Sequence, residues 1–517
     1  MPDRFEGIAD AGLDRAFLEL VINEHRRAAL PRLERMWAYF RDPAEPVGAS
    51  GWSAEAPARG GRWAGAQAAS LPARFRGGED DEREIVIEND IAWRVQTMVD
   101  FMFGKPVQIL STARDEDLRG TVERVLDAVW EASGGIALLQ DIALLGHVYG
   151  HVDLALRLDE EALISRSAVL AALERGSREA LAELIRVEVI EPRRGIPVLN
   201  PDDYRRLDAF VIHFERGLNE VERAGPDSAG GTAWGSAWGW GRGVRRARGR
   251  DGRAPSGPGA RRSGTVTEVL GPGRRVVFHD GRAALRESSV LLPGVVPVVH
   301  IQNLSQPFRY EGLSEVEPLI GLQNELNTRL SDRARRVTMS SFQMYLAKRL
   351  EGFEKAPVGP GRVWSTDDPD ASIEAFGGDA ACPSEAEHIE QIREAMDKVS
   401  GVPPLAGGVV RAKIGNLSSA NALRITLMSL LAKTARKRVT YGAGIEKVSR
   451  MVLTALDAAG ILRTHPGDRG IRLVWPDPQP IEPGDAVVAA KQKVELGVPR
   501  ERALAELGYA PSDAGVS

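Results

Sequence analysis

Two histidines four residues apart, His147 and His151 in the stretch "GHVYGH", have the spacing of a zinc-binding pair on one face of a helix. A zinc site needs at least three protein ligands, and no third candidate follows nearby. Gly146 and Gly150 also weaken any helix that would present the pair. We therefore expect packing or surface histidines, with no metal and no cofactor. The alternative is a hydrolase built on this pair, which stoichiometric zinc would reveal.

Motifs of the common enzyme classes are missing from the sequence. The chain has no Walker A pattern, no HExxH and no GxSxG. Its one cysteine, Cys382, excludes an intramolecular disulfide and a cysteine-based zinc cluster. The residues thus form no catalytic constellation.

A basic and aromatic segment occupies about residues 225–263. Eight arginines from Arg242 to Arg262 stand against one acid, Asp251, and three tryptophans come just before them. Basic residues beside aromatic ones can neutralise phosphates and stack on bases, so 234–262 could form a nucleic-acid-binding module. The segment has no apolar periodicity, and we favour a disordered, solvated insert. The tryptophans are Trp234, Trp238 and Trp240.

Acidic residues line one side of the helix predicted over 383–399. Plotted at 100° per residue, its acids and its apolar residues fall on opposite sides. No cation stands in the acidic stripe to relieve the repulsion, although the plain alternative is the wet face of an amphipathic helix. The acidic side holds Glu387, Glu390, Glu394 and Asp397, and the apolar side holds Ile389, Ile392, Met396 and Val399.

A loop without acids follows this helix. The stretch "VSGVPPLAGGVVRAKIGNLSSANALRI", 399–425, carries Arg411 and Lys413, and its glycines favour a mobile backbone. Asn416 or Ser418 can cap the next helix. The loop at 400–417 is therefore predicted to lie between two helices and to offer positive charge.

Helices and strands that position these residues follow from apolar periodicity. We predict helices over 12–42, from about 85 to Gly104, and over 119–148, 166–184, 314–341 and 418–459, and two short helices after 480. Capping boxes, "SEVE" at 314–317 and "SEAE" at 384–387, open the helices before and after 342–382. Predicted strands are "VQIL", "HVDLALRL", "RVEVIEP", "AFVIHFER", "GTVTEVL", "RRVVFHDG", "VVPVVHIQ", "FQMYLA", "GRVWS", "SIEAF" and "IRLVW". The fold class is α+β, mainly helical.

Length and composition set the remaining bounds. With 517 residues the chain can hold two to four domains, and 43% hydrophobic with 27% charged residues is ordinary for a globular protein. A net charge of -5 gives no global reason for nucleic-acid or membrane binding. The first residues lack the pattern of a signal peptide, and no run of 18 apolar residues occurs in the sequence. We therefore expect a soluble protein that neither spans nor binds a membrane.

Three ordered segments resemble the portal proteins of tailed bacteriophages, in the branch typified by phage SPP1. The first is "ENDIAWRVQTMVDFMFGKPVQI", with its helix and Gly-x-Pro turn. The second is "VVHIQNLSQPFRYEGLSEVEPLIGLQNELNTRLSDRARRV", in which a strand and an Asn precede Ser-acid-x-Glu and a helix with Gln-x-x-x-Asn and Ser-Asp. The third is "GVPPLAGGVVRAKIGNLSSANALRITLMSLLAKTARKR", with Gly-Asn-x-Ser before a long helix with a basic middle. Together they span about 85–510. The insert 225–263 departs from the pattern.

The resemblance implies a portal fold assembled as a ring, without catalytic residues of its own. Double-stranded DNA would pass through the channel during packaging and ejection, without base specificity, beside Glu387, Glu390, Glu394, Asp397, Arg411, Lys413 and Asn416. In that arrangement 1–312 would be the wing, 313–341 and 383–399 the stem, 342–382 the clip, 400–417 the tunnel loop, 418–459 the long wing helix and 460–517 the crown.

Partners and location are also implied by the resemblance. A homo-oligomer, usually of twelve subunits, would sit at one vertex of the virion capsid after assembly in the bacterial host cytoplasm. Its protein partners would be the terminase large subunit, which hydrolyses ATP, then the head-tail adaptor, and the capsid and scaffolding proteins.

Overall fold

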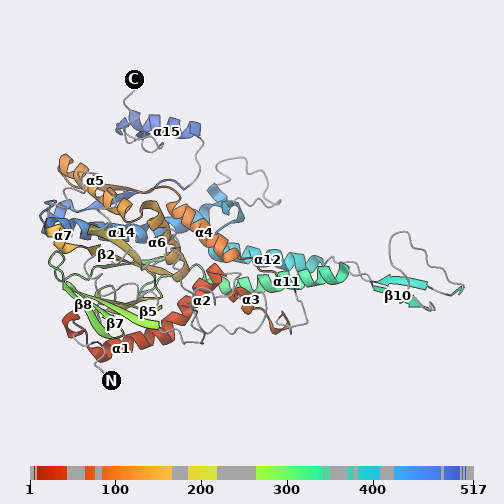
Figure 1. Ribbon diagram of the computed structural model, residues 1–517. Coiled ribbons are helices and arrows are strands. Elements are labelled where there is room, and N and C mark those ends of the chain that lie inside the picture. Colours follow the sequence, from red (N-terminus) through yellow and green to blue (C-terminus); the bar gives the residue numbers. More distant parts are fainter. Residues whose placement is uncertain are drawn as a thin grey trace, which may run out of the picture.

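The computed structural model describes residues 5, 8–42, 65–75, 84–165, 184–217, 263–341, 344–348, 369–370, 372–376, 382–407, 424–478, 483–500, 503–504 and 507. These residues form a body of helices and sheets from which two long helices project as a rod (Figure 1). The expected α+β class is confirmed. Residues 166–183 of the helix expected over 166–184, residues 225–262 of the insert expected over 225–263 and the strand expected at 361–365 lie outside the described residues.

A nearly continuous helical stretch opens the body, as predicted over 12–42. Asp14 caps its start, because the carboxylate accepts two backbone N–H groups of the first turn. Asp42 ends it in the left-handed region at φ 31°. The stretch consists of α1 (Arg15–Glu24), the π-helical turn η2 (His25–Ala29) and α2 (Leu30–Arg41).

The next long helices differ from prediction in two respects. The helix expected from about residue 85 begins at Asp90, and the helix expected over 119–148 is divided. Helix α4 (Asp90–Phe103) begins after Asn89, whose side chain accepts the Ala92 N–H, and ends at Gly104 as predicted. The helix predicted over 119–148 is wrong as a single element. It is two helices, α5 (Glu116–Ala132) and α6 (Gly135–Tyr149), bent by 67°. Gly134 and Gly135 cause the break, because both adopt positive φ, 131° and 58°.

No helix among the described residues has, by itself, the length and apolar character needed to cross a membrane. Helices α5 and α6 reach those values only when they are taken together across their bend.

Four antiparallel sheets complete the described architecture. A three-stranded sheet has the order β3-β2-β9, a five-stranded meander runs β4-β5-β6-β7-β8, and two ribbons pair β1 with β12 and β10 with β11. The strands are β1 (Gln108–Ser111), β2 (His151–Leu158), β3 (Ile185–Ile190), β4 (Gly195–Leu199), β5 (Leu207–Gly217), β6 (Ser263–Gly271), β7 (Arg274–His279), β8 (Arg282–Ser288), β9 (Val298–Gln302), β10 (Met344–Lys348), β11 (Ser372–Phe376) and β12 (Ile471–Val474).

Most predicted strands within the described ranges are confirmed, but β4 and β8 were not predicted. Strand β4 is short and contains Pro197, a residue that lowers strand propensity. Every residue of β8 is exposed, so its sequence, "RAALRES", shows no alternation of apolar and polar positions.

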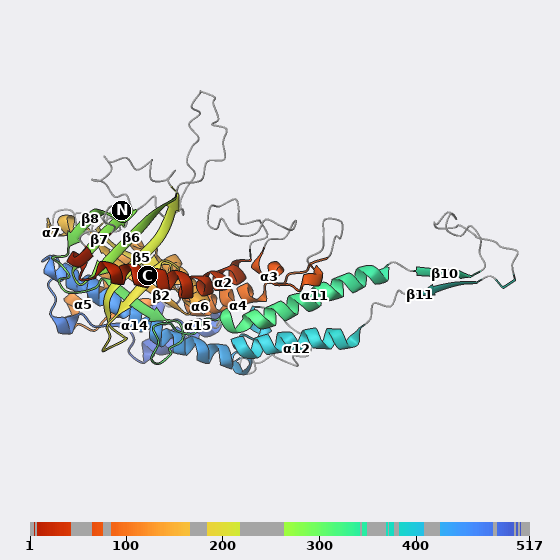
Figure 2. The same ribbon diagram turned by 90° about the horizontal axis from the view of Figure 1, so that it is seen from below.

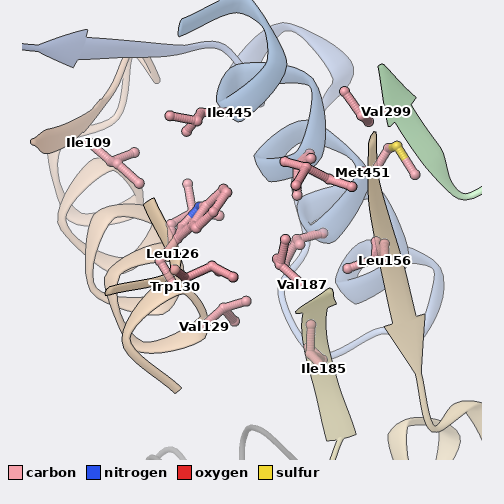
Figure 3. Close-up of a cluster of buried hydrophobic side chains, with 14 of the residues drawn as sticks. Ile109, Leu126, Val129, Trp130, Leu156, Ile185, Val187, Val299, Ile445 and Met451 are labelled. Carbon is pink, nitrogen blue, oxygen red and sulfur yellow. The ribbon is translucent and has the colours of Figure 1, made fainter. Parts of the chain in front are cut away.

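The largest hydrophobic core among the described residues lies between α5, the three-stranded sheet, the ribbon of β1 and β12 and the long helix α14 (Met428–Ala458). Figure 3 shows Trp130 of α5 and Ile445 and Met451 of α14 in this cluster, with side chains of β2, β3 and β9 around them. The Trp130 Nε1–H donates to the Ser449 Oγ at 3.1 Å, so the one polar atom of this indole is satisfied inside the core. Helix α14 is therefore a central element of the body, packed against helices and strands on several sides.

The rod consists of α11 (Ile320–Ser341) and α12 (Pro383–Ser400), which lie side by side in Figure 2. Both ends of α12 and the end of α11 at Ser341 agree with prediction. Helix α11 begins at Ile320, after a 3-10 turn over Glu317–Leu319, instead of at the predicted 314, and neither capping box is complete. The Ser314 Oγ accepts the Glu317 N–H at 3.2 Å, yet Glu317 pairs with Arg32 instead of turning back. The box at 384–387 does not form, because Pro383 is already helical and the helix begins after Cys382.

The C-terminal region continues from the rod through α14 and β12 to α15 (Pro483–Glu495), the first of the two short helices predicted there. The predicted start of the long helix at 418 lies outside the described residues. The remaining short elements are η1 (Ile8–Ala11), α3 (Ala66–Ala69), η4 (Ala73–Phe75), α7 (Glu160–Ile164), η6 (Glu317–Leu319), η8 (Pro404–Gly407) and η9 (Pro466–Asp468).

Candidate functional site

The acidic side of α12 lies at the surface of the rod. Its amphipathic pattern is confirmed for six residues, since Glu387, Glu390 and Glu394 are exposed while Ile389, Ile392 and Met396 are buried. Val399, predicted on the apolar side, is 46% exposed. At three residues past Met396 it lies about 60° around the helix, at the edge of the buried arc.

Asp397 is the member of the acidic set that turns toward the body. Its Oδ1 accepts from Arg94 Nη2 at 2.7 Å, and the Arg94 side chain is only 1% exposed. The same guanidinium donates to Asp90 at 2.8 Å and, through Nη1, to the Ser400 Oγ and the Val402 carbonyl, both at 2.9 Å. Asp397 therefore anchors the end of α12 to α4.

One cation, Arg393, pairs with a carboxylate of the acidic side. From the sequence we expected no cation there. The Arg393 guanidinium donates to Glu390 Oε1 at 3.0 Å and to Glu88 Oε2 at 2.7 Å. Residues three apart on a helix are neighbours, so this pairing follows from the spacing. Within the described part of the chain, Glu387 and Glu394 have no hydrogen-bond or ion-pair partner.

Helix α11 attaches to the body through a column of buried polar side chains. Asn327 Oδ1 accepts the Glu88 N–H at 3.1 Å, and Ser331 Oγ accepts the Val86 N–H at 3.0 Å. Gln323 donates to the Glu88 carbonyl at 2.5 Å. These three side chains repeat every four residues and hold the segment before α4 beside the rod. The motif Gln-x-x-x-Asn is thus a structural attachment.

Three charges meet where the rod joins the body, two buried (Glu315 and Lys437) and one partly buried (Lys433), and we call them the ion cluster. Glu315 is 3% exposed and accepts from Lys433 Nζ at 2.5 Å and Lys437 Nζ at 2.9 Å. Burial pushes the pKa of Glu315 up, but the two ammonium groups outweigh it and bring the pKa down to about 2. Burial lowers the pKa of Lys437 to about 8.

The ion cluster also joins the two flanks of the segment 408–423, which lies outside the described residues. Lys433 donates to the Ser400 carbonyl at 2.7 Å, and the Ser429 Oγ donates to the Gly401 carbonyl at 3.0 Å. Ser400 and Gly401 precede the segment, whereas Ser429 and Lys433 follow it. Both flanks are therefore held to each other and to the start of the rod.

Neutral polar side chains lie between the ion cluster and helix α6. The Tyr441 O–H donates to Asn303 Oδ1 at 3.1 Å, and its oxygen lies 3.4 Å from His147 Nδ1. Gly146 makes this approach possible, because a Cβ there would lie 2.0 Å from the Tyr441 hydroxyl oxygen. Burial lowers the pKa of His147 well below its ordinary value, so this histidine is neutral at pH 7.

The histidine pair lies on two different elements. Gly150 ends α6 at φ 88°, so His147 is helical while His151 begins β2. Near His151, the Asp153 Oδ1 lies 2.8 Å from the Nδ1 of His300 on β9. Over the described ranges of the chain, no group of three or more His, Cys, Asp or Glu side chains is placed to hold a metal ion.

The predicted loop residues Arg411, Lys413 and Asn416 lie outside the described residues. Sequence reasoning also missed the ion cluster and Arg94. A signal for the cluster was present, because Leu430, Lys437 and Tyr441 fall on one face of a long helix. A lysine on a core-facing position requires a buried carboxylate partner.

Comparison with known proteins points to one family. Residues 289–508 match the family model "Phage portal protein, SPP1 Gp6-like". Among solved structures, the chain is similar to "Virion of native gene transfer agent (GTA) particle" and to "Neck of empty GTA particle computed with C6 symmetry", each at 13% identity over 81% of this chain and 90% of the other, with TM-scores of 0.41 and 0.38. No curated protein matches significantly.

Proposed function

We propose that this chain is a structural, non-enzymatic portal protein that forms the ring at the unique capsid vertex. Its residues 289–508 match the model of the phage portal proteins of the SPP1 Gp6-like family. Double-stranded DNA is packaged and ejected through the ring. The terminase large subunit docks on it first and the head-tail adaptor follows. The observation that carries the proposal is that the matched residues include the whole rod, the ion cluster and α14.

The parts of the subunit follow from this proposal. The rod, 313–341 with 383–399, is the stem, and 342–382 at its far end is the clip that meets the terminase. Residues 400–417 form the tunnel loop. Residues 1–312 and 418–459 make the wing with its long helix, 460–517 make the crown, and twelve copies close the ring.

The charges of the stem suit a channel for sliding DNA. Exposed Glu387, Glu390 and Glu394 on each copy repel phosphates and leave no strong site at which DNA could stop. Arg411 and Lys413 make exchangeable phosphate contacts that are salt sensitive and read no base sequence. Asp397, held by Arg94, keeps the end of the stem fixed below the loop.

Electron microscopy of the purified full-length protein in negative stain tests the proposal. We expect rings with a central channel. A variant without 225–263 is expected to form the same rings, whereas a nucleic-acid-binding module that depends on this insert would lose DNA affinity. Monomers under every assembly condition would refute the portal assignment.

Replacing Arg411 and Lys413 by alanine tests the loop. We expect normal rings with reduced DNA packaging or retention, because each lost cation removes one phosphate contact. Packaged DNA per particle is the measurement. Packaging at the wild-type level in the double variant would remove the phosphate-contact role from the loop and leave the ring assignment untouched.

A further inference from the structure

Helix α15 presents an apolar strip that the described part of the subunit leaves uncovered. Val487 and Val494 are 57% and 38% exposed, and Lys491 is exposed between them. At spacings of four and three residues, the three side chains lie on one side of the helix. The helix stands apart from the body (Figure 1). We call Val487, Lys491 and Val494 the α15 face.

A cavity of about 1100 Å³ lies between α5 and the ribbon of β1 and β12, and we call it the α5 cavity. Its apolar wall includes Ile109 of β1, Trp130 of α5 and Ile445 of α14, which are labelled in Figure 3. Along α5 the lining runs from Arg119 to Glu131, a length of about 18 Å. Helix α15 is about 20 Å long, so the two lengths match.

The charges of the α5 cavity favour a cation beside Asp127. Glu123, Asp127 and Glu131 line the cavity at intervals of four residues, so they lie on one side of α5. Burial, and then the negative charges of Glu123 and Glu131, raise the pKa of Asp127 to about 6. The cations that line the same cavity are Arg119 and Arg472. An ammonium group placed at Asp127 would stabilise its charged form.

We propose that the α15 face of one copy docks in the α5 cavity of a second copy of this chain, with Lys491 beside Asp127 and the two valines against the apolar wall. This inference rests on the ring of the proposed function. The α15 face and the α5 cavity are different surfaces of the subunit. Their contact is therefore heterologous, and it repeats from copy to copy until the ring closes.

The place of α15 in the subunit favours a second copy over the same chain as the occupant. Leu473 of β12 lines the cavity, and eight residues connect β12 to α15. Since eight residues span at most about 28 Å, α15 stays near this side of its own body. It nevertheless lies outside its own cavity, with its valines exposed. In a ring, the next copy offers the same cavity to this uncovered face.

The contact lies at the end of the body that is away from the rod. Helix α5 occupies that end in both Figure 1 and Figure 2. Docking there joins the last described long helix of each copy to the body of the next. The ring is then held at the body as well as along the rod.

Zero-length cross-linking of the wild-type protein tests which copy fills the cavity. A carbodiimide joins a lysine amine to a carboxylate that it directly contacts, and mixing isotope-labelled with unlabelled protein before assembly marks the copies. We expect cross-linked peptides that join Lys491 to Asp127, or to its neighbours Glu123 and Glu131. Peptides with one labelled and one unlabelled half show that the contact is between copies.

A double-mutant cycle tests the pair of Lys491 and Asp127. We compare Lys491→Met, Asp127→Asn and the double variant, and we measure the concentration at half assembly by analytical ultracentrifugation. Each single change is expected to raise this concentration about fivefold or more. The double variant is expected to match the weaker of the two single variants, because both changes remove the same contact.

The matched control for the cycle is Lys493→Met. Lys493 is exposed on the same helix, but it lies about 200° around the axis from Lys491. Its replacement is expected to change the half-assembly concentration less than about twofold, and to multiply with the effect of Asp127→Asn. Thermal unfolding of the unassembled variants checks that each subunit is folded.

Three outcomes overturn this inference without touching the portal assignment. In the first, rings form but the cross-links of Lys491 join only halves with the same label, so α15 fills the cavity of its own chain. In the second, Lys491 in rings reaches no carboxylate of the cavity. In the third, the effects of Lys491→Met and Asp127→Asn multiply. Mixed-label cross-links in a protein that forms no rings would instead refute the proposed function and leave the docking contact standing.

Discussion

Replacing Glu315 by glutamine is expected to lower the local free energy of unfolding by about 3 to 5 kcal/mol, because the buried ammonium of Lys437 and the partly buried one of Lys433 lose their common carboxylate. Amide hydrogen exchange of peptides from α14 measures the loss. We expect exchange about a hundredfold faster or more in the variant around Lys433 and Lys437.

The matched control is Lys437→Met. This change leaves the pair of Glu315 with Lys433 intact and puts an apolar chain of similar length beside Met98, whose sulfur lies 3.3 Å from Lys437 Nζ. We expect a change below about 1 kcal/mol in either direction. Equal destabilisation by both substitutions would contradict the account of the ion cluster.

The same carboxylate gives the wild type a pH dependence that Glu315→Gln lacks. The folded pKa of about 2 lies below the ordinary value of 4.5, so the stabilisation is complete above about pH 4.5 and is lost as the pH falls toward 2. Thermal unfolding midpoints of the two proteins should therefore converge over that window.

Replacing Arg94 by methionine is expected to cost about 3 kcal/mol or more and to free the end of α12. Asp90 and Asp397 would keep their charges in poorly exposed positions, with 13% and 19% of their side chains accessible. Hydrogen exchange over residues 398–407 is the measurement. We expect it to accelerate at least about tenfold.

Arg393→Met is the control for this change. Arg393 pairs with Glu88 and Glu390, whose side chains are 42% and 49% exposed, so its loss should cost less than about 1 kcal/mol. If the two arginine variants lose the same free energy of unfolding, the burial of Arg94 does not strengthen its ion pairs.

The fold was largely predictable where one helix face is buried. The α12 pattern of Ile389, Ile392 and Met396 and the Gly104 end of α4 follow from local periodicity and backbone chemistry. The break at Gly134 and the failure of the box at 384–387 depend on tertiary packing and on which residue first becomes helical, which local rules do not determine.

The candidate site was less predictable, because charge partners come from distant parts of the chain. A helical wheel groups Asp397 with Glu387 and Glu394, yet Arg94, 303 residues away, takes Asp397 out of that group. The same applies to Glu315 and Lys433, separated by 118 residues. Sequence spacing can identify a charged face, but it cannot say which of its members another helix neutralises.

The pairing of β1 with β12 has a consequence for biosynthesis. Ser111 is opposite Ile471, so a ribosome must add 360 further residues before the first strand of the body finds its partner. At about 5 to 20 residues per second this delay is on the order of 20 to 70 seconds. During that time the apolar faces of α5 and α6 lack α14. The apolar surface that α14 covers in the folded subunit therefore stays uncovered on the nascent chain until α14 itself has been synthesised.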